Sequence, residues 1–197
     1  DKNDNVLSNW TVYSAVKGAL VEYEATEYEG NKVIRFTNVS PNASTLSLTP
    51  AKKITASTYY KVTVQLKIEG SLDENDMNES GYKGVRAGLI TGDDTATTTK
   101  YVISDIKETT LKTDKYNYLN VEFFIKGGAS DSNVTLFVGM GEDVTVAEGE
   151  DAVPYTAGTV YIKGVSFESS STTEYTDAKN NLNKDSQVIV NLSDSED

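Results

Sequence analysis

The chain contains no cysteine and no histidine, and these two absences remove whole classes of chemistry. Without cysteine there is no thiol nucleophile, no disulfide and no thiolate metal site. Without histidine there is no imidazole base and no Ser-His-Asp triad. Carboxylates, lysines and tyrosines are the side chains that remain for acid-base or nucleophilic catalysis.

Positive charge and long apolar segments are also scarce. The chain carries 18 Lys and Arg against 30 Asp and Glu, so its net charge is -12. Such a chain repels phosphate backbones and anionic membranes, and no apolar run approaches the roughly 18 residues of a membrane-spanning helix. We therefore predict no nucleic-acid partner and no membrane insertion. Because no charged-then-apolar leader opens the sequence, we expect a soluble chain from which any export signal has been removed.

Residues that favour β-strands are abundant. The 197 residues include 12 Tyr, 20 Val and 23 Thr, which pack well on a pleated sheet. In Tyr60–Ile68 apolar and polar residues alternate strictly, as in a strand with one buried face. Similar segments occur at 31–37, 45–49, 84–90, 100–106, 118–126, 133–140 and 159–168. About eight to ten short strands predict an all-β fold, an antiparallel β-sandwich of the jelly-roll kind.

The composition changes near Glu168 and indicates a domain boundary. We predict the jelly-roll domain over residues 1–169 and a polar linker over residues 170–197, which begins in a Ser/Thr-rich stretch. Within this second segment, residues 187–192 form a short apolar run. The run is either a last strand that returns to this domain or the first strand of a neighbouring one.

Four segments resemble strands of a known family. Asn5–Trp10 resembles a first strand with its tryptophan, Thr45–Pro50 and Thr58–Lys67 resemble a short strand followed by an alternating one, and Ala157–Glu168 resembles a closing strand. Together they are similar to the jelly-roll carbohydrate-binding modules of the galactose-binding-like superfamily, including the xylan- and glucan-binding modules of bacterial glycosidases. The resemblance implies an extracellular or bacterial cell-surface module that binds polysaccharide or glycan and is joined to other domains of the same polypeptide.

The same resemblance raises the question of a metal. In this family an aspartate in the closing strand often helps to hold a structural calcium ion, but Lys163 and Gly164 stand at those positions here, and lysine cannot be a calcium ligand. The acidic loop with Asp73, Asp76 and Glu79 lacks EF-hand spacing and is interpreted as a solvated loop. We predict no cofactor, and a structural calcium ion stays open.

A sugar presents an apolar C–H face and a polar rim, so a site needs aromatic rings beside hydrogen-bonding groups. We therefore sought polar and aromatic side chains that strand alternation points away from the core. Gln65, Arg86, Glu122, Phe124 and Phe137 are expected to share one such face, with Tyr82 and Tyr118 nearby. The alternative is that the rings are covered by other parts of the chain and that Arg86 and Glu122 form a structural pair.

These observations predict a protein that is not an enzyme and binds polysaccharide by aromatic stacking and hydrogen bonds. The alternative is a structural or adhesive spacer domain of a cell-surface protein with no sugar site. One enzymatic pattern was considered: Glu22, Glu24 and Glu27 follow the E-x-[acid]-x-x-E form of some β-sandwich glycosidases. Those enzymes have aspartate at the middle position, a tryptophan-rich cleft and a longer chain, so we do not assign this activity.

Overall fold

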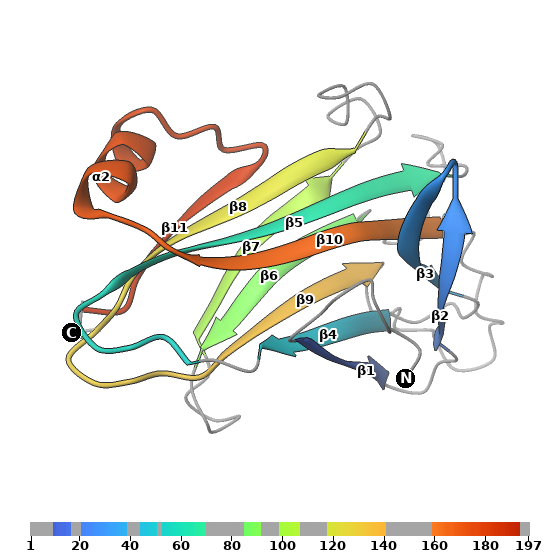
Figure 1. Cartoon of the computed structure of the whole chain (residues 1–197), viewed down its shortest axis with the longest axis horizontal. Helices are drawn as coiled ribbons and strands as arrows, with labels where there is room; N and C mark the ends of the chain where they lie inside the picture. Colours follow the sequence, from blue (N-terminus) through green and yellow to red (C-terminus); the bar gives the residue numbers. More distant parts are fainter. Residues whose placement is uncertain are drawn as a thin grey trace, which may run out of the picture.

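Two β-sheets pack face to face (Figure 1). The structure is a computed structural model that describes residues 10–16, 21–38, 44–50, 53–69, 85–91, 99–106, 118–140 and 159–193. The five-stranded sheet has the order β1-β4-β9-β6-β7 and comprises β1 (Trp10–Val16), β4 (Ser44–Pro50), β6 (Val85–Thr91), β7 (Thr99–Ile106) and β9 (Val134–Met140).

The six-stranded sheet has the order β11-β8-β5-β10-β3-β2. It comprises β2 (Val21–Tyr28), β3 (Asn31–Asn38), β5 (Tyr59–Glu69), β8 (Leu119–Lys126), β10 (Thr159–Ser169) and β11 (Gln187–Asn191). The predicted all-β sandwich of the jelly-roll kind is confirmed, and every strand segment predicted from alternation coincides with an observed strand to within one residue at each end. No helix in the described part of the chain is both long and apolar enough to span a bilayer.

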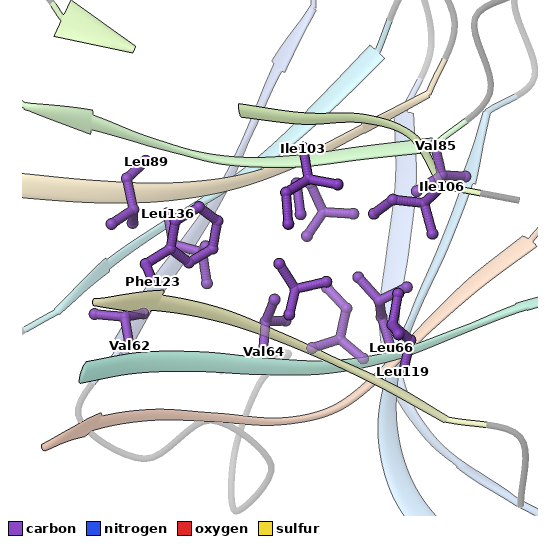
Figure 2. Close-up of a cluster of buried hydrophobic side chains, with 14 of the residues drawn as sticks. Val62, Val64, Leu66, Val85, Leu89, Ile103, Ile106, Leu119, Phe123 and Leu136 are labelled. Carbon is purple, nitrogen blue, oxygen red and sulfur yellow. The ribbon is translucent and has the colours of Figure 1, made fainter. Parts of the chain in front are cut away.

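Alternating residues of both sheets form one hydrophobic core. Val62, Val64 and Leu66 of β5 are fully buried and pack in the same cluster as Val85 and Leu89 of β6. Figure 2 shows these side chains meeting between the two layers. The core residues of each strand thus face the other sheet, so the residues between them point to opposite outer surfaces. Val33, Tyr118 and Tyr161 form a second, smaller buried cluster.

The segment after Ser169 differs from the predicted linker. Residues 172–180 form helix α2 (Thr172–Asn180), which begins at a capping box: Ser171 Oγ accepts from the Glu174 backbone N–H, and the Glu174 carboxylate accepts from the Ser171 N–H. Residues 187–191 form β11, which pairs in parallel with β8 and places Val190 in the core. The apolar run therefore returns to this domain. The sequence did not predict this helix because it is polar and lacks an apolar face. It has a capping box and one buried residue, Tyr175.

The connection from β10 to β11 crosses the outside of the six-stranded sheet. β10 and β11 run in the same direction, and β5 and β8 lie between them. The crossing starts where the Ser170 N–H donates to the Tyr59 carbonyl at 2.8 Å, and the Tyr175 ring then lies 5.5 Å from the ring of Tyr59. Tyr59 and Lys61 alternate with the core residues of β5 and so face away from the core, an arrangement called outward parity below. This crossover segment, residues 170–186, therefore covers part of the outer face (Figure 1).

A β-bulge in β10 changes which side chains face the core. Ile162 pairs with Leu66, but Gly164 pairs with Gln65, so Lys163 is the additional residue. Val160 and Ile162 are buried before the bulge, and Val165 and Phe167 pack against the core after it. The bulge thus inverts the alternation and keeps both apolar pairs inside.

Candidate functional site

The predicted site residues do not share one face. Gln65 lies on β5, and Glu122 and Phe124 lie on β8, all with outward parity in the six-stranded sheet. Arg86 on β6 and Phe137 on β9 have outward parity in the five-stranded sheet. Because the two sheets bury opposing faces in one core, these groups lie on opposite sides of the sandwich, and the prediction of a shared face is wrong. Tyr82 lies outside the described residues.

The three described aromatic residues of the prediction are covered. Phe124 is 8%, Phe137 5% and Tyr118 1% exposed. A Cβ atom at Gly88 would lie 2.6 Å from Cε1 of Phe137, so the Phe137 ring rests directly on that glycine. The centroid of the Phe124 ring lies 5.3 Å from Lys61 Nζ. Phe124 belongs to β8, which contacts α2. A sugar cannot stack on a covered ring, so these residues do not form the expected platform.

A polar network lies on the outer face of the six-stranded sheet, in the half formed by β5, β8 and the edge strand β11. Lys61 Nζ forms an ion pair with Glu122 Oε2, and Gln187 Nε2 donates to Glu122 Oε1 at 3.1 Å. The side chains of Lys61 and Glu122 are 31% and 21% exposed, so both reach solvent. Three strands, β5, β8 and β11, thus converge on one partly exposed carboxylate.

Neutral hydrogen-bonding groups extend this network along the same face. Gln65 pairs in register with Asn120, and Thr63 pairs with Glu122, so all four side chains point outward together. Asn120 is exposed and Gln65 is half-buried. On the other side of Gln65 stands Gly164, which has no side chain. Amide, hydroxyl and carboxylate groups are therefore available beside each other on β5 and β8.

A tyrosine pair lies on the same outer face toward β2 and β3. The rings of Tyr28 and Tyr161 stack with centroids 3.9 Å apart and an interplanar angle of 12°. Their hydroxyls donate to the two oxygens of Glu69, at 2.7 Å from Tyr28 and 3.0 Å from Tyr161. Lys67 Nζ lies 5.1 Å from the Tyr28 ring centroid. Tyr161 is buried, whereas Tyr28 is partly exposed.

The tyrosine pair and Glu69 shift one another's acidity. Hydrogen bonding from Tyr28 holds the pKa of Glu69 below its ordinary value, because the bond stabilises the charged carboxylate. The same bond raises the pKa of Tyr28, since it stabilises the protonated hydroxyl. Burial, with the bond to Glu69, raises the pKa of Tyr161. At neutral pH both tyrosine hydroxyls are therefore protonated and donate to the ionised carboxylate of Glu69.

Lys163 and Gly164, which stand at the family's calcium position, have other surroundings. Lys163 Nζ lies 5.1 Å from the ring centroid of Tyr118, within the range of a cation–π interaction. Among the residues that the structure describes, no group of three or more acidic side chains is arranged to hold a metal ion. The acidic loop at Asp73, Asp76 and Glu79 lies outside them, so its interpretation as a solvated loop stays a prediction.

The glutamates of the glycosidase-like pattern lie on β2, an edge strand of the six-stranded sheet. Glu24 forms an ion pair with Arg35 of β3, and both side chains are about half exposed, at 50% and 47%. Glu24 therefore makes a cross-strand surface contact.

Sequence reasoning missed Tyr28, Tyr161 and Gln187. Tyr161 stands between the core residues Val160 and Ile162, so the alternation used elsewhere would have identified it as an outward aromatic. Tyr28 ends β2 beside the turn at Glu29 and Gly30, which carries no comparable signal. Gln187 begins the apolar run that the sequence assigns either to this domain or to a neighbouring one, and its place beside β8 depends on long-range pairing.

No protein-family model matches the chain, and no curated protein does. Among solved structures, the N-terminal CBM22-1–CBM22-2 tandem domain of Paenibacillus barcinonensis Xyn10C is 8% identical, with a TM-score of 0.50 over 86% of this chain and 49% of that one. The CBM22-1–GH10 modules of Clostridium thermocellum xylanase 10B, complexed with xylohexaose, are 13% identical, with a TM-score of 0.49 over 83% and 26%.

A CBM4 structure is 12% identical, with a TM-score of 0.48 over 85% of this chain and 91% of that one. The chain thus spans about half of the tandem domain and a quarter of the xylanase fragment. At these identities the similarity concerns architecture. The chain has the β-sandwich jelly-roll fold on which carbohydrate-binding modules are built, as the resemblance of its strands indicated.

Proposed function

We propose that this chain is a non-catalytic module that binds polysaccharide or glycan on the outer face of the six-stranded sheet. The observation that carries the proposal is the combination on this face of a partly exposed tyrosine, Tyr28, with a row of outward hydrogen-bonding groups that includes Gln65, Asn120 and Glu122. A ring for the apolar side of a sugar and polar groups for its hydroxyls are what such a ligand requires.

The shared fold supports the proposal without deciding it, because one fold serves many functions. Solved structures with this architecture include modules attached to a xylanase. From the same likeness of fold we propose that the chain is located outside the cell or on a bacterial cell surface and is one domain of a longer polypeptide. Binding would then raise the effective concentration of the linked domains at the polysaccharide.

Affinity electrophoresis in native gels tests the proposal. Gels containing soluble xylan, β-glucan, starch or mannan should retard the protein in at least one case. Gln65→Ala and Tyr28→Ala should each lower the affinity measured from that retardation about fivefold, which corresponds to about 1 kcal/mol of binding free energy. Thr135→Ala, a partly exposed position with outward parity in the other sheet, is the matched control and should migrate like the parent protein.

A spacer domain without a sugar site is the second candidate. The burial of Phe124, Phe137 and Tyr118 favours it, because three rings expected to meet ligand serve packing instead. Unchanged mobility of the parent protein across a broad polysaccharide panel would establish this alternative.

A further inference from the structure

The C-terminal segment forms the edge of the proposed binding face next to Glu122. Residues 170–186 cross β5 and β8, and β11 then begins at Gln187, directly beside Glu122. The Glu122 backbone N–H donates to the Ser186 carbonyl at 2.8 Å, so the end of the crossover is fastened to the same residue. The strand that follows is anchored by Val190 in the core.

The geometry around Gln187 orients its amide in one way. The Asn183 backbone N–H, which can only donate, lies 3.0 Å from Gln187 Oε1. This contact assigns the oxygen to that side and leaves Nε2 to donate to Glu122. The Gln187 backbone N–H also donates to the Asn183 carbonyl at 2.7 Å, so side chain and backbone are held by the same turn.

Glu122 is in turn held from both sides. Lys61 contacts Oε2 and Gln187 contacts Oε1, yet the Glu122 side chain keeps 21% of its surface exposed. An ionised carboxylate offers about four acceptor positions, and two are used here. Because two contacts already hold the carboxylate in place, a sugar hydroxyl that donates to it would cost little further side-chain entropy.

We propose that Gln187 is a positioning residue of the glycan site and that the crossover and β11 are part of that site. In this arrangement Gln187 and Lys61 fix the Glu122 carboxylate as an acceptor for sugar hydroxyls. This inference rests on the proposed function, since it concerns how the same face binds its ligand. It also predicts that binding depends on a segment whose composition resembles a linker.

The test compares Gln187→Met with the parent protein in the polysaccharide gels named above. Methionine keeps the length and volume of glutamine but cannot donate to Glu122, so we expect affinity to fall three- to tenfold while the melting temperature changes little. Asn181→Ala is the matched control, because Asn181 caps α2 through the Asp177 carbonyl and belongs to the same crossover without contacting Glu122. It should bind like the parent.

A double-mutant cycle separates positioning from general stability. If Gln187 acts through Glu122, the combined variant Glu122→Gln, Gln187→Met should lose no more affinity than Glu122→Gln alone. Losses that multiply independently, or a Gln187→Met variant that binds like the parent while Gln65→Ala does not, would overturn the inference and leave the proposed function intact. Failure of the parent protein to bind any polysaccharide would overturn the proposed function itself.

Discussion

Glu69 is the residue whose charge matters most to the tyrosine pair. It accepts from Tyr28 and Tyr161, and its pKa lies below the ordinary value chiefly because of the bond from Tyr28. A carboxyl whose pKa is lower in the folded state stabilises the fold above its unfolded pKa. That contribution disappears as the pH falls through the folded pKa.

Glu69→Gln should therefore lower the free energy of unfolding at pH 7 by about 1 kcal/mol or less, since the carboxylate is exposed and screened. The difference from the parent should shrink as the pH falls below about 4.5 and vanish below the folded pKa of Glu69, where the carboxyl is protonated in both the folded and the unfolded state. Urea unfolding between pH 3 and pH 7 measures it. Glu24→Gln removes an exposed ion pair and should change little; a pH-independent effect of Glu69→Gln would contradict this account.

Gly88 is required by close packing. A Cβ atom there would lie 2.6 Å from Phe137 Cε1 and 2.9 Å from the Tyr101 carbonyl oxygen, and the backbone atom cannot move aside easily. Gly88→Ala should therefore lower the free energy of unfolding by about 1–3 kcal/mol. Chemical unfolding measures this, and adding Phe137→Leu should restore only part of the loss because the backbone contact remains. Full restoration would show that the ring is the sole obstacle.

At the level of elements, β11 decides between the two alternatives that the sequence leaves open for residues 187–192. It is five residues long and adds a parallel strand to β8, which occupies the position next to it in the six-stranded sheet. Its backbone hydrogen bonds and the burial of Val190 hold it there, and its Asn191 carbonyl accepts from the Tyr101 hydroxyl of β7 at 3.4 Å. β11 thus links the two sheets at one edge of the sandwich.

Val190→Ala should lower the free energy of unfolding by about 2 kcal/mol, because it removes two buried methyl groups and leaves a cavity. Ile189→Ala, at the neighbouring half-buried position, should cost less. Thermal unfolding of both variants provides the measurement. Equal and negligible effects would show that β11 is not part of the cooperative unit.

The bulge in β10 could be predicted from the alternation of apolar residues, but its exact position could not. Its apolar residues fall at 160 and 162 and then at 165 and 167, a change of parity that predicts an additional residue between them. Which residue is extra is decided by pairing with β5, where Gly164 meets Gln65. Lys163 is therefore the additional residue, and its Nζ lies 5.1 Å from the ring centroid of Tyr118.

At the scale of the whole molecule, the sandwich presents two separate outer faces. Gln65 and Glu122 belong to one, while Arg86 and Phe137 belong to the other. If the proposed function is right, adding an oligosaccharide that binds should shift amide NMR signals of β2, β5, β8 and β10 and leave those of β6 and β9 unchanged. Shifts concentrated around Arg86 would place the ligand on the opposite face and contradict the assignment.

The sequence by itself determined the fold class, the position of most strands and which residues form the core. These properties follow from local alternation, because side chains in a strand point to opposite sides with a period of two. The absence of cysteine and histidine likewise excluded their chemistry without reference to any coordinates. Even the direction of Gln65, Glu122 and Arg86, away from the core, was correct.

Only the tertiary structure decided which outward residues lie together. Alternation tells inside from outside but does not tell which sheet a strand joins, so Arg86 and Glu122 seemed to be neighbours although they lie on opposite surfaces. Coverage is also non-local: the crossover lies over the sheet around Tyr59 and β8, and β11 sets Gln187 beside Glu122, across 65 residues of chain. Long-range strand pairing, which no local pattern specifies, made those choices.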